Sequence, residues 1–463
     1  MKILLTHGYF LGEDSKEKLI MRPYPPLGIL YISAYLEQNG FENSVFDSTF
    51  SEMENLKTLI LDQRPEIIGI YTNLMTKLNV LKIIGFIKSE PGLSTRIVLG
   101  GPEVRNHKEK FLEYGADVIV FGEGEETMLE LMKLWRAGNS KERETNSGLY
   151  TVDGIAFKDK GEVVVTAERM LIKDIDQLPL PSRSKIDLQL YFNAWKQRHG
   201  FSMVNVNTMR GCPYSCKWCS RAVYGSSYRR RSPKLVADEI EWLQLNYSFD
   251  MIWFVDDVFT INHKWLREFC AEIRIRSLRI RYEIITRSDR VDEDVISLLK
   301  ESGCFRVWIG AESGSQKILD AMDRRVKVDQ VRQTIQLVKA SGMEAGTFIM
   351  LGYPGENESD IKETLQHLKY ANPDRYTITV AYPIKGTPLF SEVENIFVGS
   401  LPWESTTDRD IDFKRRYKRN YYNHALNWIN NEMQYTQNKK GLMSIVTKLR
   451  ALKARGMMWM TRF

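Results

Sequence analysis

Three of the five cysteines in this chain lie close together, in the stretch Arg210-Gly-Cys-Pro-Tyr-Ser-Cys-Lys-Trp-Cys-Ser220. Cys212, Cys216 and Cys219 have the spacing C-x3-C-x2-C, with the aromatic Trp218 directly before the last cysteine. Cysteine thiolates are the usual ligands of a four-iron cluster, and three of them leave one iron open, as a catalytic zinc keeps one position open. A zinc knuckle that lacks its fourth ligand is the alternative. The spacing favours an iron–sulfur cluster with room for a substrate or cosubstrate.

The segment that carries the cysteines is predicted to be a loop that follows a strand. Met203, Val204 and Val206 belong to an alternating apolar run, and Gly211-Cys-Pro breaks the chain after it. Loops at the carboxyl ends of strands are where α/β barrels place their chemistry. We therefore expect the cluster at the carboxyl edge of a barrel-like parallel sheet.

The cysteine motif resembles the signature of radical S-adenosylmethionine (SAM) enzymes. The resemblance implies that the open iron binds SAM through its amino and carboxylate groups, and that one electron from the cluster cleaves it. The 5′-deoxyadenosyl radical formed in this way abstracts hydrogen from the substrate. In such an enzyme the cofactor performs the difficult step, while the protein positions the reactants and excludes water.

The composition is that of an ordinary globular protein. The chain has 463 residues with 43% hydrophobic and 27% charged residues, which is enough for two or three domains. The net charge of +6 is small for this length and gives no argument for nucleic-acid binding. Neither a signal peptide nor an apolar run of about 20 residues is evident. Cys270 and Cys304 are expected to be buried thiols, so disulfides are not expected and a cytoplasmic location fits.

Residues 1–145 are predicted to form a Rossmann-like doubly wound domain, because short apolar runs alternate with helical patterns. The expected strands are Lys2–Thr6, Ser44–Asp47, Glu66–Tyr71, Arg96–Leu99 and Val118–Phe121. Ligands bind beyond the carboxyl ends of such strands. Gly100, Gly101, Gly122 and Gly124 fall there, and glycine allows a backbone to approach a bulky ligand.

The order of these turns, together with Pro25-Pro-Leu-Gly28, resembles the cobalamin-binding domain found in a large class of radical SAM enzymes. The resemblance implies that the four glycines contact cobalamin and that Thr72, Asn73 and Thr76 could face it, although such residues also cap helices. The chain lacks the D-x-H-x-x-G stretch whose histidine ligates cobalt in many such domains. The alternative is a vestigial domain that recruits substrate.

Residues 146–200 are expected to connect the two domains. Ile155–Asp159 and Val163–Thr166 have the pattern of a hairpin, and Leu178-Pro-Leu-Pro181 cannot lie inside a helix. The segment is therefore predicted to be a packed linker that contains a hairpin.

Residues 201–390 alternate strand and helix patterns about six times, which predicts a partial (β/α)6 TIM-like barrel. The order resembles the radical SAM core. The resemblance places SAM-contacting residues in the cysteine loop and at the strand ends: Trp218, Asp256, Asp257, Arg287, Ser288, Glu312 and Gly352. Local roles are the alternatives, because the two aspartates could cap a turn, Arg287 could pair with Asp289, and Glu312 could pair with a surface base. Arg229-Arg-Arg231 is expected to be a solvated run or a phosphate contact.

Residues 391–463 are predicted to form a helical tail, with helices over Phe413–Met433 and Gly441–Arg455. The second helix places Leu442, Ile445, Leu449 and Leu452 at helical spacing beside basic residues. A basic amphipathic helix can lie on a membrane surface, but docking of this apolar stripe on the barrel is the favoured interpretation.

The sequence therefore predicts a cobalamin-dependent radical SAM enzyme that resembles the group containing the anaerobic porphyrin-ring cyclase and many C-methyltransferases. Methylation of an unactivated carbon is the favoured reaction, and radical cyclisation, rearrangement or oxidation without methyl transfer is the alternative. Methylthiolation is rejected, because the N-terminal domain lacks the three further cysteines it needs. A non-catalytic iron–sulfur or cobalamin sensor is the alternative of another class. The expected partners are a small-molecule or lipid substrate and an electron donor such as flavodoxin or ferredoxin.

Overall fold

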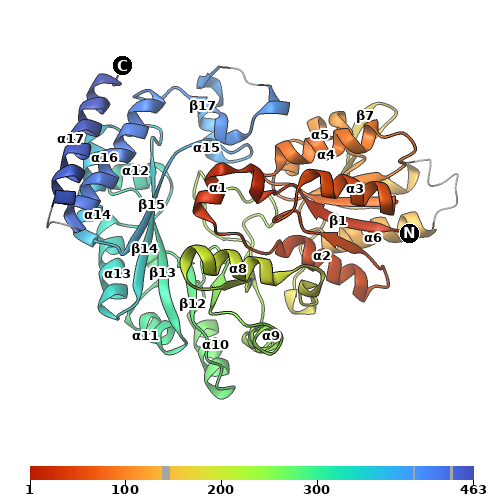
Figure 1. Ribbon diagram of the computed structural model, residues 1–463, viewed down its shortest axis with the longest axis horizontal. Coiled ribbons are helices and arrows are strands. Elements are labelled where there is room, and N and C mark those ends of the chain that lie inside the picture. Colours follow the sequence, from red (N-terminus) through yellow and green to blue (C-terminus); the bar gives the residue numbers. More distant parts are fainter. Residues whose placement is uncertain (138–145, 400–401, 438–441, 463) are drawn as a thin grey trace.

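The computed structural model describes residues 1–137, 146–399, 402–437 and 442–462. Two α/β units lie side by side, with the N-terminal unit at the right of Figure 1 and the second unit at the left. Each is built on its own sheet of parallel or mainly parallel strands. The architecture is the predicted one.

The N-terminal sheet has the strand order β2-β1-β3-β4-β5-β6-β7, and its first five strands are parallel. Their bounds are Ile3–His7 (β1), Ser44–Phe46 (β2), Ile67–Tyr71 (β3), Arg96–Gly100 (β4) and Val118–Val120 (β5). The central strands are apolar and buried on both faces, as expected for a sheet that helices cover on each side.

Two hydrophobic clusters cover the two faces of this sheet. One is formed with α3 (Met53–Gln63), α4 (Lys77–Ser89) and α5 (Lys108–Tyr114). The other is formed with α2 (Leu27–Gln38) and α6 (Glu125–Ala137). The short helix α1 (Ser15–Ile20) lies between the two units in Figure 1. Helices α1 and α3 have no counterpart among the predicted elements.

The hairpin predicted within the connection is present as β6 (Ile155–Asp159) and β7 (Glu162–Val165). The hairpin belongs to the N-terminal sheet, because β6 pairs antiparallel with β5. It therefore adds two strands, β6 and β7, to that sheet. Ile155, Ala156 and Phe157 are fully buried there. The apolar face of the hairpin thus gives the sheet an antiparallel edge.

The second sheet is the predicted six-stranded partial barrel, with the order β15-β14-β13-β12-β11-β8 and parallel pairing throughout. Its strands are Met203–Val206 (β8), Met251–Phe254 (β11), Tyr282–Thr286 (β12), Cys304–Glu312 (β13), Glu344–Leu351 (β14) and Arg375–Val380 (β15). Its main helices are Pro233–Asn246 (α9), His263–Ile275 (α10), Glu293–Glu301 (α11), Val328–Ala340 (α13) and Glu358–Ala371 (α14). The connecting helix α8 (Leu188–His199) buries its aromatic residues. Cys270 and Cys304 are buried, as predicted.

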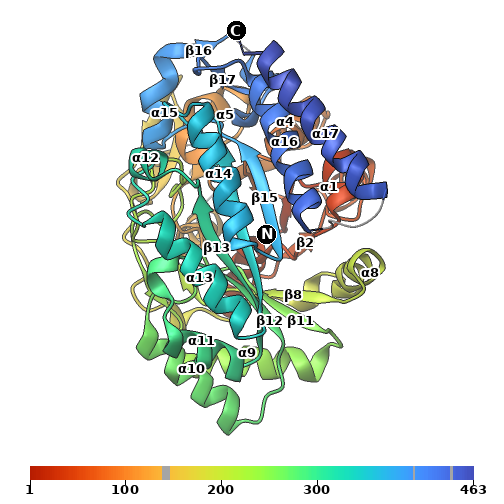
Figure 2. The ribbon, with the colours of Figure 1, turned by 90° about the vertical axis from the view of Figure 1, so that its left-hand side faces the viewer.

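The C-terminal region first crosses toward the N-terminal unit and then returns to the barrel (Figure 1). The crossing segment holds α15 (Pro388–Val393), β16 (Phe397–Val398) and β17 (Asp412–Phe413). The return is made by α16 (Arg419–Gln437), against which α17 (Leu442–Met460) packs; the two helices lie side by side in Figures 1 and 2. Residue 441, where the second tail helix was predicted to begin, lies outside the described residues.

Helix α17 packs against α16, but the prediction that its apolar stripe forms the docked face is wrong. Its buried side chains are Ser444, Ala451, Ala454 and Met458. Ile445, Leu449 and Leu452 of the predicted stripe are 54–60% exposed. Small side chains allow the two helices to approach closely, so the larger apolar residues point outward. In the described part of the chain, no helix combines the length and apolarity required to cross a bilayer.

Candidate functional site

The three motif cysteines lie in a loop that a short antiparallel pair closes at its base. This pair consists of β9 (Met209–Arg210) and β10 (Arg229–Arg230), and the loop follows β8 at the carboxyl edge of the barrel. Cys216 is buried, Cys212 is half-buried and Cys219 is exposed. Desolvation, followed by the negative charges of Asp257, Cys212 and Cys216, raises the pKa of the Cys219 thiol to about 12. The three thiols therefore influence one another across a shared space.

Two guanidinium groups point at the most buried of these thiols. Nη1 of Arg324 lies 3.5 Å and Nη1 of Arg287 3.8 Å from the Cys216 sulfur. The Arg287 guanidinium also stacks on the Tyr214 ring at 3.8 Å. Adjacent positive charge favours the thiolate, which is the form that binds metal. The donor set of three thiols next to two arginines fits an anionic iron–sulfur cluster.

Asp256, a predicted SAM contact, uses its carboxylate inside the protein. Its side chain is 1% exposed and accepts hydrogen bonds from the backbone N–H groups of Thr208 at 2.8 Å and Met209 at 3.2 Å. It also lies 3.5 Å from Nη2 of Arg230. These contacts tie the end of β11 to the start of the cysteine loop.

Asp257 and Glu312 contrast with Asp256, because neither carboxylate has a hydrogen bond or ion pair within the described residues. The pKa of Asp257 is raised by desolvation and then by Asp256. Desolvation also raises the pKa of Glu312, although Arg324 and Arg287 counteract this. Glu312 ends β13 with a positive φ of 66°, a strained conformation that clusters at functional sites. Both carboxylates therefore remain available to a ligand.

The other predicted SAM contacts lie along the same edge. Arg287 makes its predicted local pair, with Asp289 at 2.8 Å, in addition to its contact with Cys216. The buried Ser288 hydroxyl has no hydrogen-bond partner among the described residues. Gly352 follows β14 with a φ of 77°, and its carbonyl accepts a hydrogen bond from Nε of Arg415 at 3.0 Å. Trp218 packs against an apolar cluster that includes Tyr353.

A cavity of about 620 Å³ opens at the carboxyl edge of the N-terminal sheet. Six of the seven predicted cobalamin contacts line it: Asn73, Thr76, Gly100, Gly101, Gly122 and Gly124. Thr72 does not line it. Its side chain is fully buried, and its backbone N–H donates to the Gly100 carbonyl at 2.7 Å. Asn73 orders the turn that precedes α4, because its Oδ1 accepts from the N–H groups of Met75 and Thr76 at 2.9 and 3.0 Å.

Gly101 shows why this edge requires glycine. Its φ is 107°, and a Cβ atom at this position would lie 2.4 Å from the Thr72 carbonyl oxygen. No side chain fits there without moving the backbone. The turn after β4 therefore packs its backbone tightly against the end of β3, and Gly101 lines the cavity at that position.

The cavity offers no free imidazole among the described residues. His7 is the histidine that lines it, but its Nε2 lies 3.0 Å from Oδ1 of Asp47 and its Nδ1 accepts from the Tyr9 N–H at 3.1 Å. The absence of a D-x-H-x-x-G stretch thus has a structural counterpart. A cobalamin bound here would have no histidine ligand from this cavity wall.

Sequence reasoning missed that the turn after β5 holds the two units together. Glu123 Oε1 lies 2.8 Å from Nη1 of Arg210, and its Oε2 lies 2.6 Å from Nη1 of Arg229. Both arginines belong to the strand pair that closes the cysteine loop. Glu125 completes the pairing of Arg210. Acidic residues between the glycines of a buried turn are the signal that could have identified these contacts.

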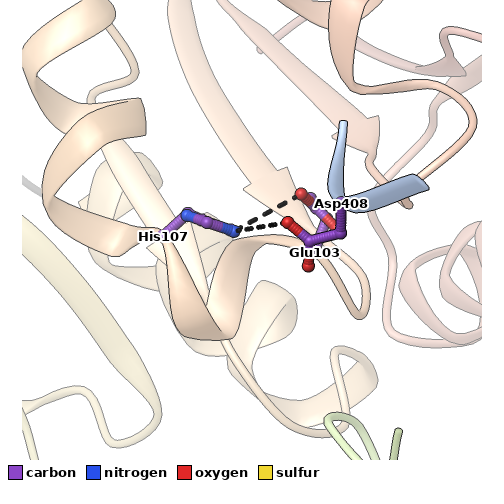
Figure 3. Close-up of side chains that lie close together, drawn as sticks. All are labelled: Glu103, His107 and Asp408. Carbon is purple, nitrogen blue, oxygen red and sulfur yellow. Dashed lines mark ion pairs between the residues drawn. The ribbon is translucent and has the colours of Figure 1, made fainter. Parts of the chain in front are cut away.

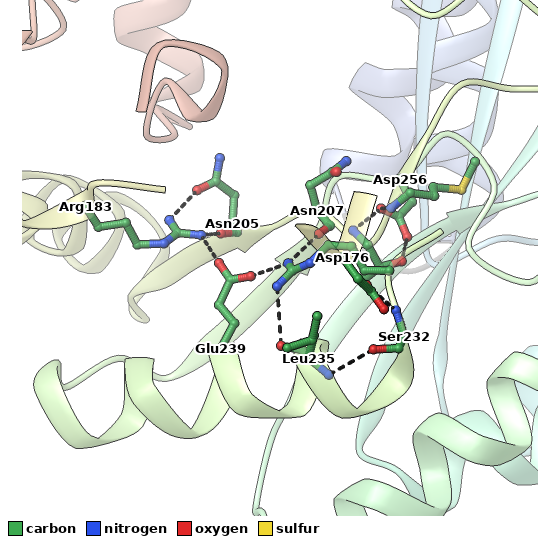
Figure 4. A network of polar contacts seen from close by, with 11 residues as sticks. Asp176, Arg183, Asn205, Asn207, Ser232, Leu235, Glu239 and Asp256 are labelled. Atoms are coloured by element: carbon green, nitrogen blue, oxygen red, sulfur yellow. Dashed lines mark hydrogen bonds and ion pairs between the residues drawn. The ribbon is translucent and has the colours of Figure 1, made fainter. Parts of the chain in front are cut away.

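The prediction that Arg229-Arg-Arg231 is solvated is wrong. Arg231 is buried and pairs with Glu239, while Arg230 stacks over Trp265 at 3.5 Å. Figure 4 shows Glu239 on α9 also pairing with Arg183, at 2.8 Å. Glu123, from the turn after β5, and Glu239, from the adjacent helix α9, neutralise the run, so it lies inside the protein and holds the cysteine loop in place.

Comparison with known proteins divides the chain in the same way. Residues 21–132 match the B12 binding domain, and residues 206–368 match the Radical SAM superfamily. An uncharacterized methyltransferase of Pyrococcus horikoshii, PH0819, is 28% identical over 426 residues, which are 90% of this chain and 88% of that protein. The anaerobic magnesium-protoporphyrin IX monomethyl ester cyclase of Cereibacter sphaeroides is 27% identical over 85% of this chain and 64% of its own length.

A solved structure has the same fold. The radical SAM methyltransferase TsrM from Kitasatospora setae, with cobalamin and a 4Fe-4S cluster bound, superposes with a TM-score of 0.70 at 18% identity. The superposition covers 85% of this chain and 78% of that one. At this level of identity the likeness concerns the arrangement of the two units.

Proposed function

Because this chain belongs to the radical SAM enzymes that carry an N-terminal B12-binding domain, we propose that it methylates an unactivated carbon of a small-molecule or lipid substrate. The chain is an enzyme whose cofactors are a 4Fe-4S cluster, SAM and cobalamin. When bound, the cluster supplies the electron for reductive cleavage of SAM, and cobalamin serves as the methyl carrier.

One observation carries the proposal: the cysteine loop and the glycine turns share a cavity wall. Val223 and Tyr224 of the cysteine loop line the cavity together with Gly100 and Gly122. A Cβ atom on Gly122 would lie 3.9 Å from the Val223 carbonyl oxygen. Methyl transfer to a substrate radical requires the two cofactor sites to be adjacent, and this shared wall supplies that adjacency.

The residues at the barrel edge divide the binding of SAM between them. Cys212, Cys216 and Cys219 hold the cluster, with Arg287 and Arg324 offsetting its negative charge. Asp257 and Glu312 are the free carboxylates, and they bind the ammonium or ribose groups of SAM. Asp256, whose oxygens are occupied, is a positioning residue that fixes the loop.

Radical cyclisation or oxidation without methyl transfer is the second candidate, and the similarity to the anaerobic cyclase favours it. Both candidates use the same cluster and the same SAM cleavage. Both also require an external one-electron donor, for which a flavodoxin or ferredoxin is suitable.

The test uses protein that is reconstituted without oxygen with iron, sulfide and hydroxocobalamin. It measures the reaction products and the fate of a labelled methyl group. We would supply SAM carrying a deuterated methyl group and a reductant, together with a metabolite extract from the source cells. Methylation predicts 5′-deoxyadenosine and a metabolite that gains the labelled methyl group. Deoxyadenosine with a converted but unlabelled metabolite would support the second candidate, and no deoxyadenosine at all would contradict both.

The exposed face of α17 supports contact between the enzyme and a membrane surface. Ile445, Leu449, Leu452, Trp459 and Met460 are each more than half exposed. Residues 442–463 contain five basic residues and no acidic residue. An apolar stripe flanked by positive charge fits the surface of an anionic membrane, which would bring the enzyme to a lipid substrate.

Sedimentation with vesicles tests this contact. Full-length protein should bind vesicles that contain phosphatidylglycerol, and binding should weaken at high salt. Leu449→Glu with Leu452→Glu should abolish it, whereas Leu245→Glu, at an 80% exposed leucine on α9, should leave it unchanged. Equal binding by the two variant proteins would contradict the contact.

A further inference from the structure

Glu103, His107 and Asp408 form a buried cluster between the two halves of the chain (Figure 3). Glu103 and His107 flank a short turn between β4 and α5, and Asp408 lies in the C-terminal crossing segment, in the 3-10 helix Asp408–Asp410. Their exposed fractions are 6%, 5% and 4%. One ligand atom from each residue lies within 4.8 Å of the other two.

The spacing of these atoms is too wide for hydrogen bonds. Nε2 of His107 lies 3.6 Å from Oε1 of Glu103 and 4.0 Å from Oδ1 of Asp408, beyond the usual limit for a hydrogen bond. Both ring nitrogens of His107 and Oε1 of Glu103 are buried and have no hydrogen-bond partner among the described residues. Buried polar groups are rarely left in this state, because leaving one without a partner forfeits its hydration without a replacement.

The same spacing fits three atoms around one metal ion. Ligand atoms about 2.0–2.2 Å from a tetrahedral zinc ion lie roughly 3.4 Å apart. The gap of 3.6 Å to Glu103 is close to this value, and the gap of 4.0 Å to Asp408 closes with a small side-chain movement. One imidazole and two carboxylates form a ligand set used by divalent transition metals. As Figure 3 shows, the histidine ring points at both carboxylates.

The neighbouring groups do not fill the space between the three side chains. The second oxygen of Asp408 accepts the Lys385 N–H at 2.7 Å, which orients the carboxylate. Lys77, Lys385 and Lys110 are the nearby cations. The Lys77 ammonium donates to the Thr406 carbonyl at 2.5 Å and lies 4.3 Å from the Trp403 ring centroid. No ion pair joins Lys77 to the three residues within the described chain.

We propose that Glu103, His107 and Asp408 bind one divalent transition-metal ion of the Zn²⁺ type. The ion joins the crossing segment to the loop that follows β4. Because Gly100 and Gly101 of that loop line the cavity, the ion stiffens a cavity wall. It is a structural ion, separate from the cysteine loop.

The test measures zinc binding to cluster-loaded protein, since free motif cysteines would themselves bind zinc. After treatment with a chelator, the protein is titrated with Zn²⁺ against a chromophoric competitor. Wild-type protein should bind one equivalent. His107→Gln and Asp408→Asn should each weaken binding at least about tenfold, since even outer partners of a metal ligand are worth that much.

His263→Gln is the matched control, because this histidine faces a single carboxylate, Asp292, at 3.8 Å. It should bind zinc like the wild type. Equal binding by the His107 and Asp408 variants, or no binding by the wild type, would overturn the proposal. Should those variants not fold, the melting temperature of wild-type holoenzyme decides: a rise that saturates at one equivalent supports the site, and no rise overturns it. Neither readout involves SAM cleavage, so the result is independent of the proposed reaction.

Discussion

The two sheets of this protein present very different carboxyl edges to one another. The N-terminal edge presents glycine turns and aromatic residues beside a few charged side chains such as Glu17 and Arg22, and the histidine that lines it among the described residues is already paired. The barrel edge carries three thiols, two arginines directed at one of them, and two free carboxylates. The first edge selects a ligand by shape and the second by charge. A cofactor pair of one large corrin and one anionic cluster with SAM matches that division.

The two edges are nevertheless joined by buried charge. Glu123, in a glycine turn of the first, pairs with Arg210 and Arg229 at the base of the cysteine loop of the second. The glycine turn therefore serves both regions: its backbone lines the cavity, and its carboxylate positions the loop that holds the cluster.

The largest effect is expected for Cys216→Ala, which removes the thiol that faces both arginines. It should abolish cluster binding and reduce deoxyadenosine formation to background, while cobalamin binding remains. Iron analysis and mass spectrometry would measure this. Cys270→Ala, at a buried thiol remote from the loop, should retain both cofactors, and a cluster retained by Cys216→Ala would contradict the assignment.

Glu123→Gln should lower the stability of the whole chain by about 3 kcal/mol, since it removes the one carboxylate that Arg229 pairs with and one of the two that pair with Arg210. Urea unfolding monitored by circular dichroism would measure the loss. Glu126→Gln is the control, because Glu126 is 42% exposed and pairs with Arg169 at 3.7 Å; it should cost less than about 1 kcal/mol. Equal losses would show that the two edges are not joined through Glu123.

Gly101→Ala should weaken cobalamin binding at least about tenfold, because its backbone strain is worth about 1–3 kcal/mol and tenfold corresponds to about 1.4 kcal/mol. Iron content should not change. Gly92→Ala has a similarly positive φ of 81° but meets no atom within 4 Å, so it isolates the conformational cost from the clash. A visible titration with hydroxocobalamin would compare the two variants.

Glu312→Gln should weaken SAM binding about tenfold while the cluster and cobalamin remain. A hydrogen bond to a charged group contributes about 1.5–3 kcal/mol, and the amide removes that charge. Equilibrium dialysis with labelled SAM would measure the change. Glu344→Gln, at the opposite end of the same sheet, should bind SAM normally; the free-carboxylate assignment fails if both variants bind SAM like the wild type.

The last prediction concerns pH. Burial raises the pKa of Glu356, beside Gly352, from 4.5 to about 8. The native state thus holds this proton more tightly than the unfolded state does. Protonated Glu356 therefore contributes to the free energy of unfolding, and this contribution is complete below pH 4.5. It is lost as the pH rises toward 8, by at most about 1.4 kcal/mol per pH unit.

Glu356→Gln should remove this pH dependence of the unfolding free energy. Glutamine can still accept the hydrogen bond from the Gly352 N–H that Glu356 accepts. The quantity to measure is the difference in unfolding free energy between wild type and variant from pH 5 to 8. A difference that stays constant over this range would contradict the raised pKa.

The sequence predicted what local patterns can encode. Alternating apolar runs located the parallel strands, and the cysteine spacing located the chemistry, because each depends on residues near one another in the chain. The errors have a common cause. Arg229 pairs with Glu123 and Arg231 pairs with Glu239. These pairs form only in the folded chain, so the cationic run was predicted to be solvated.

The face of α17 was predicted wrongly for a related reason. Periodicity identified an apolar stripe but could not reveal that Ala451 and Ala454 allow a closer approach to α16. Likewise, no local pattern joins His107 to Asp408, about 300 residues later in the chain. Glu312 was found from its motif, but its unpaired and strained state appears only in the structure.

The most direct test of the account measures iron and cobalt in the same anaerobically reconstituted preparations. Wild-type protein should contain about four iron atoms and one cobalt per chain. Cys216→Ala should lose iron and keep cobalt, and Gly101→Ala should lose cobalt and keep iron. Loss of both metals in either folded variant, or a wild-type protein that binds no cobalt, would contradict two adjacent but separately built cofactor sites.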